Sequence, residues 1–145
     1  MAYFSDADEV YRFMGTLLRN LSDDAELAPS LRRANTIVQY RLARPDAVIT
    51  SRLIEGQPDQ VDCGETTLDP EVVMSMDADV AHRFWLGQVS PTVALARGLM
   101  KAKGPVAKIL RLVPLVQPVF PRYQRMLEEA GREDLLEPVR QPPPG

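Results

Sequence analysis

Residues 85–112 read WLGQVSPTVALARGLMKAKGPVAKILRL and change their hydrophobic period twice. Pro91 begins a short helix, because proline is favoured in a first helical turn, where its missing N–H costs nothing. Residues 99–103 then alternate with the period of two that is typical of a strand. Pro105 begins another helix, whose apolar residues recur at helical spacing from Val106 onwards. The stretch therefore predicts a helix, a short strand and an amphipathic helix.

Four further strands are predicted upstream of this stretch. Residues 36–42 and 47–54 each alternate, and Arg44-Pro45-Asp46 makes the turn between them. A second turn signal precedes residues 61–63, so three consecutive strands form an antiparallel meander. Residues 72–76 predict a fourth strand. It leads into a helix that Gly87 terminates.

The remaining predicted helices lie near the ends of the chain. Ser5 caps a first amphipathic helix, and a short second helix is expected to end at Pro29. Prolines interrupt the apolar residues 113–120, so this segment is expected to be irregular. Pro121 begins the last helix. Residues 1–131 are predicted to form a single domain, and residues 132–145 a flexible, proline-rich tail.

This order of elements resembles the sterol carrier protein type 2 family of lipid-binding domains. The residues that carry the resemblance are Trp85, Gly87, Ala94, Gly98, Met100, Lys101, Gly104, Leu110 and Leu112. In that family the corresponding stretch walls a hydrophobic tunnel for a fatty acyl chain, a sterol or a phospholipid. We therefore expect an α+β fold, with a mixed, mostly antiparallel sheet of about five strands, about five helices over one face and an apolar tunnel between the two layers.

Composition is that of an ordinary globular protein, with 145 residues, 45% apolar and 26% charged side chains. A single cysteine excludes an internal disulfide, which fits a reducing, cytoplasmic location. The N-terminus lacks the features of a secretory signal, and no apolar run approaches the roughly 20 residues of a membrane span.

Charge is distributed unevenly along the chain. Between Val80 and Leu127 there are eight basic residues and no acidic one, whereas the rest holds nine basic and twenty acidic residues. The basic residues form either a solvated face or a rim that makes transient contact with an anionic membrane surface or an anionic head group. Nucleic acid is not expected as a partner, because aromatic residues do not alternate with the basic ones and the protein is acidic overall.

No catalytic constellation, metal site or cofactor motif is predicted. His82 is the only histidine and is expected to be partly exposed on a helix surface. Cys63 is expected to be a buried, inert thiol, because no basic residue adjoins it in the sequence. Helix capping accounts for Asp77 and Asp79, and no third metal ligand follows them.

Large, soft apolar side chains are more numerous than an amphipathic core requires, and methionine suits an interior that closes around varied ligands. The predicted ligand-binding residues are Val38, Tyr40, Ile49, Met74, Met76, Trp85, Met100, Leu110, Val113, Val116 and Phe120. Lys101, Lys103 and Lys108 are expected nearer a head group or a membrane. The predicted function is non-enzymatic binding and intracellular transfer of a lipid: a fatty acid, fatty acyl-CoA, sterol or phospholipid.

Two alternatives remain open at this point. The first is an accessory enzyme for a hydrophobic metabolite, in which Tyr40, Tyr123 or His82 supplies a proton. The second is an interaction or dimerisation module that uses residues 113–120 as its interface. The sequence leaves the oligomeric state undecided.

Overall fold

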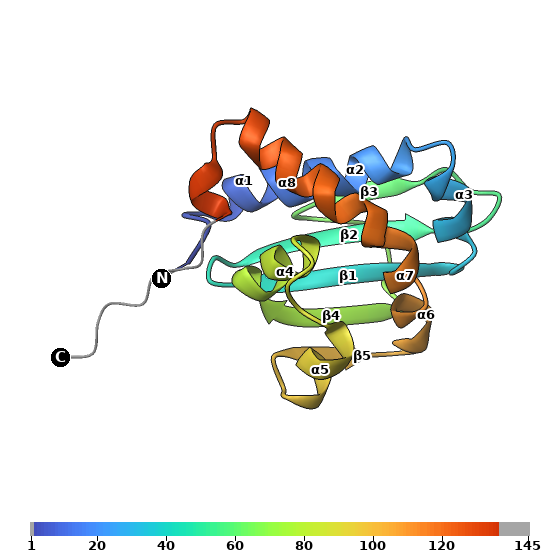
Figure 1. Cartoon of the computed structure of the whole chain (residues 1–145). Helices are drawn as coiled ribbons and strands as arrows, with labels where there is room; N and C mark the ends of the chain where they lie inside the picture. Colours follow the sequence, from blue (N-terminus) through green and yellow to red (C-terminus); the bar gives the residue numbers. More distant parts are fainter. Residues whose placement is uncertain (1, 137–145) are drawn as a thin grey trace.

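The computed structural model describes residues 2–136, and its centre is a five-stranded sheet (Figure 1). The strands are β1 (Thr36–Ala43), β2 (Ala47–Leu53), β3 (Gln60–Cys63), β4 (Val72–Asp77) and β5 (Met100–Lys103). Their order is β3-β2-β1-β4-β5, and only the β1–β4 pair is parallel. The predicted α+β class, the mixed and mostly antiparallel sheet and the β1-β2-β3 meander are confirmed.

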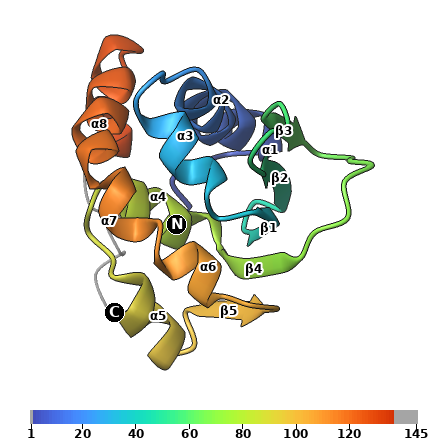
Figure 2. The same ribbon diagram turned by 90° about the vertical axis from the view of Figure 1, so that its right-hand side faces the viewer.

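The helices cover one face of this sheet (Figure 2). Pairing places Tyr40 of β1 opposite Ile49 of β2 and Met74 of β4, so these three side chains share the covered face. The connection from β3 to β4 runs along the opposite side, because β4 lies beyond β1 rather than beside β3. On that side Gln39 and Thr50 are buried, and the Gln39 amide donates to the Thr50 hydroxyl at 3.2 Å.

The first helical run consists of α1 (Ala7–Val10), the π-helical turn η1 (Tyr11–Gly15) and α2 (Thr16–Ser22). Its cap is Asp6 rather than the predicted Ser5, because the Asp6 carboxylate accepts from the Glu9 N–H at 2.9 Å. Helix α3 (Leu27–Arg32) runs through Pro29, where the sequence predicted an end. Pro29 lies in the first turn of α3, where no N–H is needed for the helix ladder.

The stretch that decides the fold forms the predicted helix, strand and helix: α5 (Pro91–Ala96), β5 and α6 (Ala107–Leu110). Helix α4 (Ala78–Trp85) precedes it and is closed by Gly87 at a φ of 78°. A Cβ on Gly104 would lie 2.1 Å from the Glu71 carbonyl oxygen, so only glycine fits between β5 and the start of β4. Asp77 occupies the cap position of α4, but its side chain bonds Arg44 instead of the helix.

Residues 113–129 are helical almost throughout, which corrects the expectation of an irregular segment. They form α7 (Val113–Val116), the 3-10 turn η2 (Gln117–Val119) and α8 (Phe120–Glu129). Each proline falls at the first or second position of one of these elements, where it is tolerated. The prolines therefore divide the segment into short helices without unwinding it.

Packing continues beyond Gly131, where the domain was predicted to end. The 3-10 turn η3 (Glu133–Leu135) buries Leu135, and Arg132 bonds Glu9 of α1 at 2.6 Å. Residues 137–145 of the expected tail lie outside the described residues. Among residues 2–136, no helix is long and apolar enough to cross a membrane.

Candidate functional site

An apolar cavity of about 100 Å³ lies between the covered face of the sheet and the helices. Eight of the eleven predicted ligand-binding residues line it: Tyr40, Met74, Met76, Trp85, Met100, Leu110, Val113 and Val116. Val38 and Ile49 also point to the covered face but are fully buried in the core and do not line the cavity. Phe120 lies behind the wall, with its ring 5.5 Å from Phe84 and 6.4 Å from Trp85.

Twelve further lining residues come from α2, α3, α4, α5, α6, β2 and the connecting segments, and the predicted set contained none of them. The lining residues it missed are Leu18, Leu21, Ser22, Leu31, Ser51, Leu53, Asp59, Ala81, Phe84, Pro91, Ile109 and Leu112. Leu18 and Leu21 belong to the predicted amphipathic face of the first helix, and Ser51 and Leu53 to the inward positions of a predicted strand. Periodicity thus marked them as inward-facing, but it does not distinguish a core position from a cavity wall.

The part of the roof formed by α6 and α7 is packed less tightly than the floor of the cavity. On the floor, Met74, Met76 and Met100 are buried, with at most 8% of each exposed. On the roof, α6 contributes no buried residue and α7 contributes only Val116. Helices this short that bury so little are held by few packing contacts, which lowers the free-energy cost of moving them outward.

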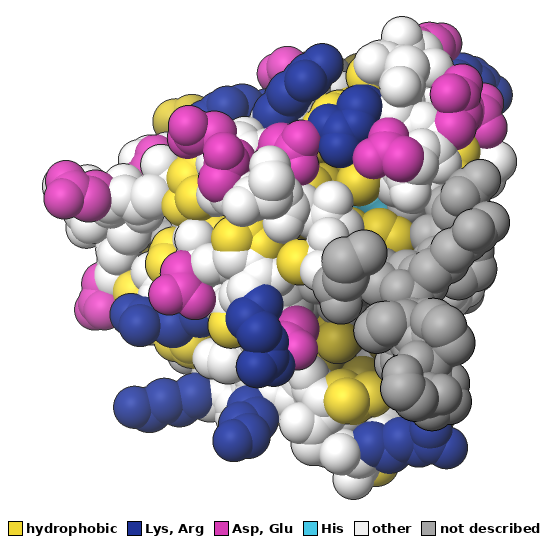
Figure 3. Space-filling view, turned by 90° about the vertical axis from the view of Figure 1, so that its left-hand side faces the viewer, with side chains coloured by type: hydrophobic (Ala, Val, Ile, Leu, Met, Phe, Trp, Pro, Cys, Tyr) yellow, Lys and Arg dark blue, Asp and Glu magenta, His cyan; other side chains and the backbone are white. Residues whose placement is uncertain are grey.

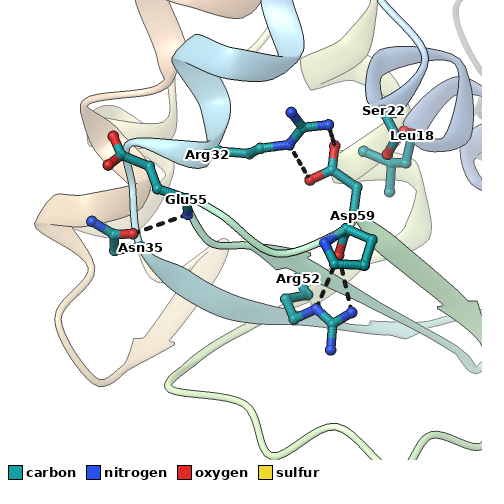
Figure 4. A network of polar contacts seen from close by, with 8 residues as sticks. Leu18, Ser22, Arg32, Asn35, Arg52, Glu55 and Asp59 are labelled. Carbon is teal, nitrogen blue, oxygen red and sulfur yellow. Dashed lines mark hydrogen bonds and ion pairs between the residues drawn. The ribbon is translucent and has the colours of Figure 1, made fainter.

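Polar groups gather at the part of the cavity formed by α2, α3 and β2. Ser51 is 4% exposed, and its hydroxyl has no hydrogen-bond partner among the described residues. Burial raises the pKa of Tyr40 to about 12. The Asp59 carboxylate is bonded by Arg32 at 2.9 and 3.4 Å, and the neighbouring Pro58 carbonyl accepts from Arg52 (Figure 4). The carboxylate at this end is thus already neutralised by an ion pair.

His82 is fully buried, which corrects the prediction of a partly exposed histidine. Its Nε2 lies 2.6 Å from the Leu135 carbonyl oxygen and its Nδ1 lies 2.8 Å from the Tyr123 hydroxyl. A carbonyl only accepts, so Nε2 carries the hydrogen and Nδ1 accepts from Tyr123. Burial lowers the pKa of His82 and raises that of Tyr123. Neither residue lines the cavity, so the pair ties α4 to α8 and η3.

Cys63 is half-buried rather than buried, and it has a basic neighbour that its sequence surroundings did not reveal. An Arg19 guanidinium nitrogen lies 3.6 Å from its sulfur. Burial nevertheless raises the pKa of the thiol, which keeps it protonated. The described part of the chain contains no group of three side chains suited to hold a metal ion.

The three lysines expected near a head group lie outside the cavity. Lys101 and Lys103 are exposed on β5, and Lys101 pairs in register with Ser75 on the face away from the helices. Lys108 of α6 bonds the Glu71 carboxylate at 2.9 Å and the Asn35 carbonyl at 3.2 Å. A second, open hollow of about 420 Å³ includes Lys108, Arg33 and Arg111, and it shares Leu112 with the cavity.

Comparison of the sequence with known proteins gives one partial match. No model of a known protein family matches the chain. The mouse hydroxysteroid dehydrogenase-like protein 2 is 26% identical over 114 residues, which are 79% of this chain and 22% of that protein. The chain thus spans about a fifth of the length of this relative.

Solved structures resemble the chain over most of its length. The apo sterol carrier protein 2 of Yarrowia lipolytica matches with a TM-score of 0.64 and 18% identity, over 82% of this chain and 98% of its own. The sterol carrier protein domain 2 of Helicoverpa armigera matches with a TM-score of 0.55 and 14% identity, over 92% of each chain. The Aedes aegypti sterol carrier protein 2 in complex with palmitate matches with a TM-score of 0.52 and 18% identity, over 78% of this chain and 96% of its own. The fold of this chain is therefore that of the sterol carrier protein 2 domains.

Proposed function

We propose that the chain binds a long-chain lipid or a sterol in the cavity and transfers it between membranes without changing it chemically. The observation that carries this proposal is the cavity itself, which is apolar and walled by methionines and other large apolar side chains. Burial of an acyl chain there contributes about 0.8 kcal/mol per methylene, which drives binding without catalysis. The Aedes aegypti protein of the same fold, which holds palmitate, supports the same ligand class.

The cavity volume and the weakly packed roof together describe how such a ligand enters. A cavity of about 100 Å³ is smaller than an engineered cavity of about 150 Å³ that binds benzene, so a long chain requires a wider space. We infer that α6 and α7 move outward to form the tunnel, because α6 buries no side chain and α7 buries only Val116. Methionines on the floor adapt to the shape of the chain.

Membrane contact is proposed for the edge of the molecule formed by α5 and β5. Val93 and Leu99 are 48% and 52% exposed there. Lys101 and Lys103 follow on β5, and basic side chains line the lower edge of the molecule in Figure 3, the level at which α5 and β5 lie in Figure 1. Each Lys or Arg near an anionic surface contributes about 1 kcal/mol, so this edge favours acidic lipids.

The enzyme alternative has less support. Of the three proton donors considered, only Tyr40 lines the cavity, and burial keeps it protonated.

The dimerisation alternative is also weakened, because Val116 and Val119 of the apolar run are buried within the chain itself. Leu115 is the large apolar residue of that run that stays exposed, at 38%. A monomer in analytical ultracentrifugation would argue further against an interface there.

The proposed function is tested first by native mass spectrometry of the protein as purified, followed by solvent extraction of anything bound. A co-purifying lipid, or saturable uptake of a fluorescent long-chain lipid by delipidated protein, is the expected result. Transfer is then measured between donor and acceptor vesicles with and without phosphatidylserine. Protein that takes up neither acyl chains nor sterols would contradict the proposal.

A further inference from the structure

The cavity differs in polarity along its length. Its hydroxyl and carboxyl groups come from Ser22 of α2, Ser51 of β2, Tyr40 of β1 and Asp59 just before β3. At the far end, α4, α5 and β5 contribute only apolar lining residues, among them Trp85, Pro91 and Met100. In the strand order β3-β2-β1-β4-β5, the polar end therefore lies over β2 and β1 and the apolar end over β4 and β5.

The strand register gives the distance between the polar end and the apolar end of the cavity. Ser51 lies opposite Val38 of β1, whereas Met100 lies opposite Met76, which lies opposite Leu42 of β1. From Ser51 to Met100 the floor thus crosses three strand spacings and advances four residues along the strands. At about 4.8 Å per strand and 3.3 Å per residue, the two are roughly 20 Å apart. An extended long acyl chain matches that span.

Within residues 2–136, Ser51 carries the buried side-chain polar atom that lacks a hydrogen-bond partner. Its hydroxyl is buried and makes no hydrogen bond to any described residue, although it borders the cavity. Tyr40 also borders the cavity, from the neighbouring strand. Buried hydroxyl groups without partners are unfavourable, and a ligand that supplies one gains the free energy of that hydrogen bond.

We propose that the cavity orients its ligand, with an uncharged hydroxyl group bonded to Ser51 and Tyr40 and the hydrocarbon tail directed toward Trp85 and Met100. This inference rests on the proposed function, since it names the ligand class of the same cavity. A long-chain alcohol, a sterol and an acylglycerol share the required chemistry. Fatty acids in their ionised form do not.

The charges around the polar end explain why an anion is disfavoured there. Asp59 is the charged residue among the lining side chains, and its carboxylate would repel a second one. Its partner Arg32 already donates two hydrogen bonds to it and does not line the cavity. An ionised head group would lose its hydration without gaining a cation.

The first test compares hexadecan-1-ol with its methyl ether, 1-methoxyhexadecane, delivered from phosphatidylcholine vesicles to the full chain. We expect wild type to prefer the alcohol, and Ser51→Ala and Tyr40→Phe each to lower its affinity by about 2- to 10-fold, the effect of one neutral hydrogen bond. The ether should bind wild type more weakly than the alcohol and lose less affinity in the two variants, because its oxygen accepts a hydrogen bond but donates none. Ser75→Ala is the matched control, because Ser75 lies on the other face of the sheet.

The second test reads the orientation through Trp85, the one tryptophan of the sequence, which lines the apolar end. Bromine quenches tryptophan fluorescence only at short range. We expect 16-bromohexadecan-1-ol, which carries bromine at the tail, to quench Trp85 more strongly than 2-bromohexadecan-1-ol, which carries it beside the hydroxyl. Stronger quenching by the 2-bromo compound would overturn the proposed orientation.

The outcomes separate this inference from the proposed function. If none of the alcohol, the ether, palmitate and cholesterol binds, the proposed function itself is wrong. If palmitate at pH 7 binds more tightly than hexadecan-1-ol and Ser51→Ala leaves both unchanged, the carrier function stands and the hydroxyl-specific polar end is wrong. Equal binding of alcohol and ether to every variant leads to the same conclusion.

Discussion

The two halves of the helical layer lie on the same face of one sheet and are packed differently. Over one half, the first helical run and α8 bury long side chains completely, as Phe13 and Tyr123 show at 2% and 0% exposure. Over the other half, α6 buries no residue. The covered face of the sheet carries mostly apolar side chains beneath both halves, so the difference arises in the helices. A cavity forms where proline-divided helices are too short to fill the space above the strands.

The largest difference between the two halves is expected in the free energy of unfolding when one residue of each half is truncated to alanine. Phe13→Ala should lower the free energy of unfolding by about 3–5 kcal/mol, because its ring is buried against Phe4, with the two centroids 6.3 Å apart. Leu110→Ala should cost less than about 1 kcal/mol, because Leu110 is half-buried and already borders empty space. Urea denaturation of both variants measures the difference. Equal losses would show that the two halves are packed alike.

Filling the cavity should remove binding without removing stability. Ala81 of α4 lines the cavity and is 7% exposed. Ala81→Leu places three more carbons there, and we expect the affinity for a long-chain lipid to fall at least about tenfold, since a lost methylene site costs about 0.8 kcal/mol. The melting temperature should stay equal or rise. Ala107→Leu on the exposed side of α6 is the control, and it should leave lipid affinity unchanged.

The tightly packed half also carries a buried histidine that makes stability depend on pH. Burial lowers the pKa of His82 below its ordinary value of about 6.5, so the folded state holds the ring neutral while the unfolded state protonates it. Stability is thus fully present above about pH 6.5 and falls below it, by up to about 1.4 kcal/mol per pH unit. The loss stops at the folded-state pKa.

Urea denaturation at pH 7.5, 6.5 and 5.5 measures this dependence in wild type and in His82→Gln. His82 is the only histidine in the sequence, and the carboxyl groups with shifted values, such as Glu9 and Asp134, titrate below this range. We therefore expect the variant to be less stable at pH 7.5 but nearly independent of pH. A wild-type slope that persists in His82→Gln would assign the effect to another group.

Particular residues show how far the sequence predicts such a molecule. Alternating hydrophobicity within residues 36–54 and 99–103 was sufficient to predict the strands there. Side chains of a half-buried strand alternate between its two faces, whatever packs against the buried one. The burial of His82 could not be foreseen, since its partners lie 41 and 53 residues away, on α8 and η3. The placement of Ser51 at the cavity was equally hidden, because the local pattern is the same for a residue in the core.

The smallest effect is expected from the ion pair that holds the loosely packed roof. Lys108 of α6 bonds Glu71 at 2.9 Å, and the two side chains are 34% and 45% exposed. Exposed pairs of this kind contribute about 0–1 kcal/mol, so Lys108→Met should barely change the free energy of unfolding. Because this contact joins α6 to the start of β4, its loss should instead speed the exit of a fluorescent lipid in stopped-flow measurements. Arg122→Met, which removes the pair between α8 and Asp24, is the matched control and should leave the exit rate unchanged. Equal acceleration in both variants would mean that the roof is not the part of the helical layer that opens.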